Sequence, residues 1–176
     1  MSKLIDNILQ FSSYRANSDK LPIEEIDISK TLEESLSLIE TSIQSKNIKI
    51  EVNKSNNLIP NINANKISIL RMFNNLLSNA IKFSDRDSTI FISFASDNNH
   101  LRVEIKDEGT GISNDKIAQL FLPFKHSGVG TDGEKGTGLG LSIVKEIVEG
   151  NNGKIGIESE LGKGTSVKIS FDKGAA

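Results

Sequence analysis

Three polar residues recur along one side of a helix-forming segment, and their side chains could hold a metal ion and a phosphate. The stretch NNLLSNAIKFS, residues 74–84, carries Asn75, Asn79 and Lys82. At 100° per residue these positions fall within about 60° of one another. A carboxamide offers a neutral oxygen to a hard cation, and a lysine offers a point charge to a phosphate. An ordinary solvent-facing stripe is the alternative, although Glu and Lys favour a helix more than Asn does.

A carboxylate and two glycines follow a predicted strand, a pattern that suits close approach of a ligand. In HLRVEIKD, residues 100–107, Asp107 shares the parity of the apolar side chains of the strand. We therefore expect Asp107 to point toward the core, where a carboxylate needs a partner. Gly109 and Gly111 follow, so the backbone can come close to a ligand there. The alternative is that Asp107 only caps a strand-ending turn.

Further candidates lie in the C-terminal third of the chain. The segment GEKGTGLGLSIVKEIVEG, residues 133–150, places Gly136, Gly138 and Gly140 at the start of a predicted helix. Free N–H groups and the helix dipole make such a start an anion site. The glycine spacing matches neither a Walker A motif nor a Rossmann fingerprint. Thr165 shares the parity of apolar residues in the last predicted strand, so it either packs on the inner face or binds there.

The elements that must position these residues alternate early and end in hairpins. We expect helices over residues 29–46, 65–83 and 138–149, with a shorter one over 114–121 and Ser29 capping the first. Strands are expected over residues 24–29, 47–53, 88–95, 100–107, 154–159 and 164–171, with a loop over 55–65. This order predicts an α/β two-layer sandwich, in which a mixed, mostly antiparallel sheet carries helices on one face.

The N-terminal residues are expected to form a separate unit. Residues 2–17 have the pattern of an amphipathic helix, and a turn follows over residues 17–22. This helix either packs on its own domain or forms half of a helical hairpin that dimerises, and the sequence leaves both interpretations open. We therefore expect an N-terminal segment over residues 1–20 and a domain over residues 21–173.

Composition excludes several classes of function. The net charge of −2, with both signs interspersed, argues against nucleic-acid binding and direct membrane contact. The absence of cysteine excludes disulfides and zinc–thiolate sites. The sequence has no apolar run of about 18 residues and no signal-peptide segment. We expect a soluble, cytoplasmic chain, and whether a parent protein is membrane-anchored stays open.

In their order and spacing, the motifs resemble those of the catalytic ATP-binding domain of sensor histidine kinases, in the GHKL ATPase superfamily. The stretch NNLLSNAIKF resembles the asparagine box of that family, and DEGTGI resembles its first glycine box. LFLPF resembles the phenylalanine box, GTGLGLSIV the second glycine box, and GKGT the last one. The resemblance covers about residues 27–172 and implies a fold of the Bergerat type.

The resemblance implies a role for each matching residue. Asn79 would hold Mg²⁺, Asn75 would support the metal and the phosphates, and Lys82 would contact phosphate. Asp107 would accept a hydrogen bond from the adenine amino group of ATP, and Thr165 would close the adenine site. The other expected ATP contacts are Gly109, Gly111 and Ile112 beside the adenine, Phe121 and Phe124 as anchors of an ATP lid over residues 113–136, and Gly136, Thr137, Gly138, Leu139, Gly140 and Leu141 near the phosphates.

The resemblance also implies phosphotransfer rather than hydrolysis. Hydrolytic relatives carry Glu one turn before the metal-binding Asn, and the carboxamide of Asn75 cannot act as a general base at neutral pH. We expect the chain to bind Mg-ATP and to present the γ-phosphate to a histidine on a dimerisation and phosphoacceptor domain, with a response regulator downstream. A nucleotide-gated interaction module without transfer is the alternative, and a stand-alone ATPase is disfavoured by Asn75.

The two histidines of the chain do not lie in the helical setting of a phosphoacceptor. His100 is expected in a turn, and His126 follows the phenylalanine box. His126 and its neighbour Lys125 are either lid contacts to phosphate or solvated residues. The acceptor histidine is therefore expected outside this sequence, since only one helix of the dimerisation hairpin is recognisable, over residues 2–17.

Overall fold

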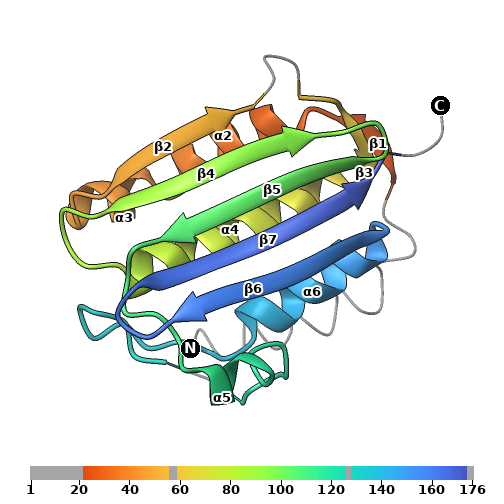
Figure 1. The fold of residues 1–176 in the computed structure, drawn as a ribbon. Helices are drawn as coiled ribbons and strands as arrows, with labels where there is room; N and C mark the ends of the chain where they lie inside the picture. The colour runs from red at the N-terminus through yellow and green to blue at the C-terminus, as the bar shows by residue number, and fades with distance from the viewer. Residues whose placement is uncertain (1–21, 56–58, 126–127, 174–176) are drawn as a thin grey trace.

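A five-stranded sheet with helices on one face forms the body of the protein in the computed structural model (Figure 1). The structure describes residues 22–55, 59–125 and 128–173. In chain order the elements are β1 (Glu24–Ile26), α2 (Ile28–Leu38), α3 (Glu40–Ser45), β2 (Lys49–Lys54), β3 (Ile62–Ala64), α4 (Lys66–Phe83), β4 (Thr89–Ser96), β5 (His100–Asp107), α5 (Asn114–Ile117), α6 (Gly140–Gly150), β6 (Gly153–Glu160) and β7 (Gly164–Asp172).

The main sheet has the strand order β2-β4-β5-β7-β6. Strands β2 and β4 are parallel, whereas the other neighbours are antiparallel. The parallel pair needs a crossover, and β3 and α4 supply it. Strands β1 and β3 form a separate antiparallel pair. The expected mixed, mostly antiparallel sheet is therefore confirmed.

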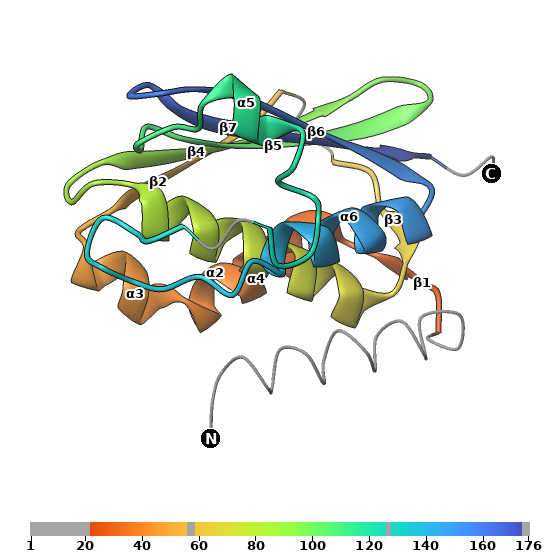
Figure 2. The ribbon, with the colours of Figure 1, turned by 90° about the horizontal axis from the view of Figure 1, so that it is seen from below.

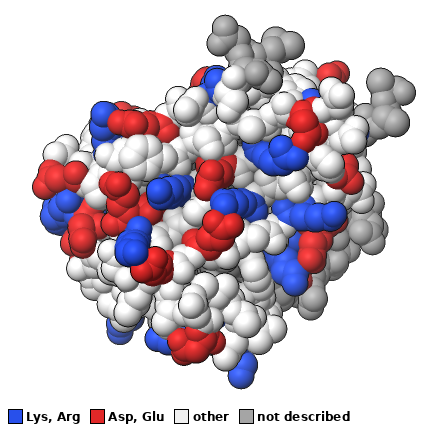
Figure 3. All heavy atoms as spheres, viewed as in Figure 1, with Lys and Arg blue, Asp and Glu red and all other residues white. Residues whose placement is uncertain are grey.

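The helices α2, α4 and α6 lie together on one side of the sheet, which gives the two expected layers (Figure 2). The opposite face of the sheet carries acidic and basic side chains interspersed (Figure 3). Strand alternation explains this division, because Leu101, Val103 and Ile105 of β5 point into the core while Arg102 points to solvent. Fully burying a side chain of this size stabilises the fold by about 1.5–3 kcal/mol.

Helix α4 lies between α2 and α6 and carries the polar stripe of the opening motif. Its N-cap is Asn65, whose side-chain oxygen accepts a hydrogen bond from Ser68 N at 2.9 Å. One side of the helix is buried through Ile69, Met72, Phe73, Leu76, Leu77, Ala80 and Ile81. The stripe residues Asn75, Asn79 and Lys82 are half-buried. The expected helix over residues 65–83 is thus confirmed to within one residue.

The region expected as one helix over residues 29–46 is two helices. The chain breaks at Ile39, whose φ of −113° and ψ of 10° depart from helical values. The N-cap is Asp27 rather than Ser29, because the Asp27 carboxylate accepts a hydrogen bond from Lys30 N at 3.0 Å. The strand before this helix accordingly ends at Ile26 instead of Ser29.

Other elements also differ from the sequence expectation. The loop expected over residues 55–65 contains β3, which is too short for a readable alternation and exists through its pairing with β1. The helix expected over residues 114–121 ends at Ile117. Helix α6 begins at Gly140, two residues after the expected start.

The expected helix over residues 2–17 and the boundary near residue 20 lie outside the described residues, as does His126. Within the described ranges, the structure contains no helix that combines the length and the apolar character needed to cross a membrane.

Candidate functional site

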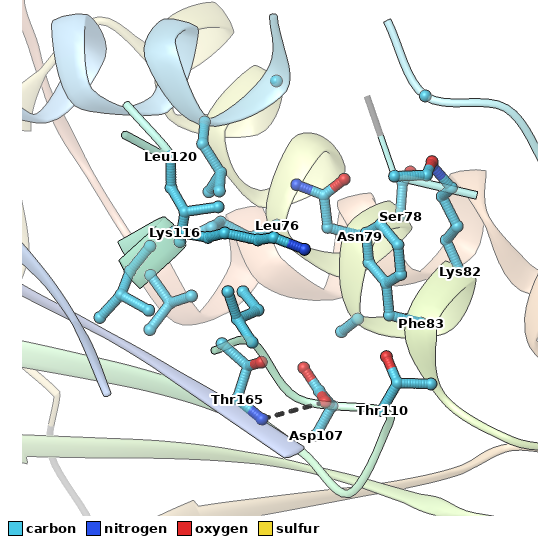
Figure 4. Close-up of a pocket in the computed structure, with 18 of the residues that line it drawn as sticks. Leu76, Ser78, Asn79, Lys82, Phe83, Asp107, Thr110, Lys116, Leu120 and Thr165 are labelled. Atoms are coloured by element: carbon cyan, nitrogen blue, oxygen red, sulfur yellow. Dashed lines mark hydrogen bonds between the residues drawn. The ribbon is translucent and has the colours of Figure 1, made fainter. Parts of the chain in front are cut away.

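A cavity of about 830 Å³ lies between α4, the ends of β5 and β7, and the segment over residues 113–136 (Figure 4). Its volume is in the range of small-molecule sites. Most of the predicted site residues line it, namely Asn75, Asn79, Lys82, Asp107, Gly111, Ile112, Gly136, Thr137, Gly138, Gly140, Leu141 and Thr165. Residues from four separate sequence motifs are therefore gathered around one cavity.

Asp107 lies at one end of the cavity, opposite Thr165 in the register of β5 and β7. The residue is 7% exposed, and its Oδ1 accepts hydrogen bonds from Gly109 N at 3.0 Å and Thr165 N at 3.2 Å. Burial raises the pKa of Asp107, and these two hydrogen bonds oppose that shift. Both bonds reach Oδ1, so the other carboxylate oxygen is left to accept a hydrogen bond from a group in the cavity (Figure 4).

Ser159, which the sequence analysis did not identify as a site residue, determines the direction in which the Thr165 hydroxyl donates its hydrogen bond. Ser159 Oγ donates to Gly164 O at 2.9 Å and accepts from Ile112 N at 2.8 Å. Because its own proton is used, Ser159 Oγ accepts from the Thr165 hydroxyl, 2.9 Å away. Thr165 therefore presents lone pairs, and this end of the cavity is rich in acceptors. Ser159 was missed because its role depends on the register of β6 and β7, in which it pairs with Thr165.

Two glycines let the backbone after Asp107 pass through a narrow gap. A Cβ at Gly109 would lie 2.1 Å from Phe83 O, and one at Gly111 would lie 1.9 Å from Glu160 O. Gly111 also has a φ of +65°, which side-chain-bearing residues rarely adopt. Gly109 does not line the cavity. It lets the loop pass close to the end of α4, and its N–H holds Asp107 in place.

The other end of the cavity carries two carboxamides and the start of α6. Asn75 Nδ2 donates to Arg71 O at 2.9 Å, which leaves Asn75 Oδ1 as the outward group. A Cβ at Gly140 would lie 3.2 Å from Asn75 Oδ1 and 3.5 Å from Asn79 Nδ2. Glycine therefore allows the α6 N-terminus to lie against both asparagines. That N-terminus has no side-chain cap, so its N–H groups can bind an anion.

These groups fit a hard divalent cation bound together with a phosphate. Carboxamide oxygens are suitable ligands for Mg²⁺, which is usually bound by few protein groups plus substrate phosphates. In the described part of the chain, no three His, Cys, Asp or Glu side chains gather into a metal site. A cation held by Asn79 and Asn75 would therefore draw its remaining ligands from phosphate and water.

The cavity is strongly basic at its rim. Its described lining residues include Lys82, Lys116, Lys125 and Lys135, against the single carboxylate of Asp107. Lys116 extends into the cavity from α5 (Figure 4). Lys116 and Lys135 were not predicted, because Lys116 lies in a helix of only four residues and Lys135 lies in an irregular segment, so neither has a periodicity from which to infer direction. Lys125, which the sequence left open, lines the cavity. This charge favours a polyanionic ligand.

Lys82 is the lysine of this set that is most firmly placed. Its Nζ donates to Gly128 O at 2.5 Å and lies 4.5 Å from the centre of the Phe83 ring. Burial lowers the pKa of Lys82, the charge of Glu134 raises it, and the charge of Lys46 lowers it. Lys82 thus links α4 to the segment over residues 113–136.

Four predicted residues do not line the cavity. Leu139 is fully buried in the core, and Gly109 acts through the backbone as described above. The Phe121 ring lies 5.7 Å from Lys145 Nζ. Phe124 is 56% exposed, and its backbone N–H donates a hydrogen bond to Gly138 O at 3.0 Å. The phenylalanine motif therefore holds the segment through a backbone contact at Phe124 rather than through its ring.

Comparison with known proteins gives a consistent result. The family described as histidine kinase-, DNA gyrase B- and HSP90-like ATPase matches residues 64–175. Sporulation kinase E of Bacillus subtilis (strain 168) is 31% identical over 170 residues, which cover 96% of this chain and 22% of that protein. Sporulation kinase A of the same organism is 31% identical over 170 residues, covering 97% and 27%. The chain thus spans about a quarter of the length of these relatives.

Solved structures agree with these sequence matches. The nucleotide-free catalytic domain of the histidine kinase ThkA is 25% identical, with a TM-score of 0.76 over 87% of this chain and 97% of that one. Full-length ShkA in complex with AMPPNP is 27% identical, with a TM-score of 0.79 over 98% of this chain and 36% of that one. Since the family match includes the segments that line the cavity, the chain belongs to the histidine kinase-, DNA gyrase B- and HSP90-like ATPase family, and its relatives there are histidine kinases.

Proposed function

We propose that this chain binds Mg-ATP in the cytoplasm and presents the γ-phosphate for transfer to a histidine on a dimerisation and phosphoacceptor domain, upstream of a response regulator. One observation carries the proposal: a single cavity has hydrogen-bond acceptors at one end, and carboxamides, lysines and a helix N-terminus at the other. This polarity matches a nucleotide, whose adenine carries an amino donor and whose triphosphate is anionic.

Adenine recognition would rest on Asp107 and Thr165. The free oxygen of the Asp107 carboxylate can accept a hydrogen bond from the adenine amino group, and the Thr165 hydroxyl has only lone pairs to offer. The apolar side chains of Ile105, Ile157 and Val167 line the same cavity and can pack on the ring faces. The ShkA structure, solved with AMPPNP, supports a nucleotide as the ligand of this fold.

Phosphate binding would rest on α4 and the α6 N-terminus. Asn79 and Asn75 would hold Mg²⁺, which when bound neutralises charge on the phosphate oxygens. Lys82 would bind phosphate directly, and the backbone from Gly136 to Gly140 would line the phosphate chain. Phosphoryl transfer needs mainly positioning and charge neutralisation, which these groups can supply.

The residue at position 75 favours transfer over hydrolysis. A carboxamide cannot take a proton from water at neutral pH, so this site has no general base at that position. An imidazole acceptor needs none before attack, because its lone pair attacks the γ-phosphorus directly. The bond to the β,γ-bridging oxygen breaks and ADP leaves, while the proton on the other imidazole nitrogen is lost on the acceptor side.

Isothermal titration calorimetry with ATP and Mg²⁺ tests the binding step. Asn79→Ala and Asp107→Asn should each weaken binding by about tenfold or more, since a lost contact of about 1.4 kcal/mol is tenfold in Kd. Asn63→Ala and Asp172→Asn, at exposed positions away from the cavity, are the matched controls. Unchanged affinity in both cavity variants would exclude this site.

The transfer step is tested by mixing the chain with an acceptor-bearing dimerisation hairpin and γ-labelled ATP. Label on a histidine supports phosphotransfer. Binding without label favours the nucleotide-gated interaction module, which would hold a partner without transferring phosphate. Steady release of phosphate by the isolated chain would show hydrolysis and contradict the role assigned to Asn75.

A further inference from the structure

A buried lysine lies where the segment over residues 113–136 meets the C-terminal end of α4. Lys46, in the turn between α3 and β2, is 3% exposed. Its Nζ donates to the backbone oxygens of Ile81, Lys82 and Ser84 at 3.0, 3.1 and 3.4 Å. A cation at this place satisfies carbonyls that a helix end leaves free and is stabilised by the helix dipole.

The same ammonium group contacts two side chains of the lid segment. It donates to Thr131 Oγ1 at 2.8 Å and forms an ion pair with Glu134 Oε1 at 2.8 Å. The other carboxylate oxygen of Glu134 accepts from Asp132 N at 2.9 Å. Both oxygens of Glu134 therefore have partners, and these partners hold the carboxylate on the side of Lys46.

Glu134 also lies beside Lys82. A Cβ at Gly130 would meet Glu134 Oε2 at 2.3 Å and Lys82 Cγ at 2.6 Å, so these two atoms are close neighbours. Thr131 N donates to Lys82 O at 3.0 Å, which keeps the turn against the helix. The charges of Glu134 and Lys46 both act on the pKa of Lys82, after the larger effect of its burial. The carboxylate is thus within electrostatic reach of both lysines.

We propose, on the basis of the nucleotide-binding function proposed above, that Lys46 is a positioning residue: it holds the Glu134 carboxylate in an ion pair and so leaves the Lys82 ammonium free to bind phosphate. A carboxylate paired with Lys82 neutralises the positive charge that would bind the phosphate. The carboxylate also repels the phosphate, because both are negatively charged. The Glu134 side chain is 38% exposed, so it has room to turn toward Lys82 once Lys46 is removed.

Calorimetry with two probes separates this role from a structural one. The probes are a non-hydrolysable ATP analogue with Mg²⁺, and adenosine, which lacks phosphates. Lys46→Met should weaken binding of the ATP analogue by about tenfold and leave adenosine binding unchanged, because the lost contact is to phosphate. Glu134→Gln should bind the analogue at least as tightly as the wild type.

The double variant Lys46→Met with Glu134→Gln is the decisive measurement. The double variant lacks the hydrogen bonds from Lys46 to the carbonyl oxygens at the end of α4. It also has no carboxylate at position 134 that could compete with phosphate for Lys82. Its affinity for the ATP analogue should return to within about threefold of the wild type. Affinity as low as in Lys46→Met alone would show that Lys46 acts through the structure of α4, as would an equal loss of adenosine binding.

Folding is checked by circular dichroism and thermal melting, and Lys46→Gln replaces Lys46→Met if the latter is unfolded. The Glu134→Gln variant tests the proposal even if both Lys46 variants are unfolded, because tenfold weaker binding of the ATP analogue in Glu134→Gln would contradict it. If the wild type binds no nucleotide, the proposed function fails. If the wild type binds and the Lys46 variants bind equally well, only the role of Lys46 fails.

Discussion

At the scale of single residues, Asp107 is a buried carboxylate that is kept at a cost to the fold. Its carboxylate is buried, and burial raises its pKa despite the hydrogen bonds from Gly109 N and Thr165 N. A raised pKa in the folded state means that the protonated form is favoured there. The stability that Asp107 contributes is therefore full at acid pH and is lost as the pH rises through its raised pKa.

Asp107→Asn should make this cost visible. Its amide oxygen can still accept both backbone hydrogen bonds, but it carries no charge. At neutral pH the free energy of unfolding of the variant should be at least as large as that of the wild type, although the variant is expected to bind ATP poorly. The advantage should shrink as the pH falls through the raised pKa of Asp107.

Urea unfolding at neutral pH and at about pH 4 measures this difference. Asp172→Asn, at an exposed carboxylate, is the control for loss of one negative charge. A variant less stable than the wild type at neutral pH would show that the ionised carboxylate gains more from its hydrogen bonds than it loses by burial.

At the scale of elements, the N-terminal end of α4 is held by its cap, whereas its C-terminal half lines the cavity. Its N-terminal end is fixed by Asn65, whose Oδ1 accepts from both Ser68 N and Ser68 Oγ, at 2.9 and 3.0 Å. Asn65 Nδ2 also donates to Pro22 O at 2.9 Å. The C-terminal half carries the residues that line the cavity. The cap should therefore contribute to stability and little to ligand affinity.

Asn65→Ala should lower the free energy of unfolding by about 1–2 kcal/mol, because this cap is buried and makes several hydrogen bonds. The affinity for ATP, measured well below the melting temperature, should be unchanged. Asp27→Ala, which removes the exposed N-cap of α2, is the matched control and should cost less. Denaturant unfolding and calorimetry measure the two quantities. A large loss of affinity in Asn65→Ala would show that the two ends of α4 are coupled.

At the scale of the whole molecule, the cavity is bounded by both layers of the sandwich. Asp107 and Thr165 come from the sheet, Asn75 and Asn79 come from α4, and the lid segment closes one side. A ligand that contacts all of these binds the folded chain and not the unfolded one. Binding should therefore raise the melting temperature.

Mg-ATP at about 100 times its Kd should stabilise the fold by about 2.7 kcal/mol, which is about 5–10 °C for a chain of this size. Differential scanning fluorimetry measures the shift. Removal of Mg²⁺ with EDTA, or the variant Asn79→Ala, should reduce this shift strongly, because we propose that Asn79 holds the metal. A shift that is equal with and without Mg²⁺ would contradict the role of Asn79 as a metal ligand.

The sequence by itself determined the local patterns. The helical period placed Asn75, Asn79 and Lys82 on one side of α4, and the strand alternation placed Asp107 among the inward residues of β5. It also gave the two-layer class and the order of the motifs. These features depend on residues that are neighbours along the chain, so spacing alone was enough to predict them.

Only the tertiary structure decided which distant groups meet. Thr165 N bonds to Asp107 across 58 positions of the chain, and the register that joins them also brings Ser159 to the Thr165 hydroxyl. Lys46 reaches Thr131 across 85 positions, and Lys125 and Lys135 face the cavity from an irregular segment. Such contacts follow from strand register, helix ends and loop paths, which are set by the packing of the whole core and leave no period in the sequence.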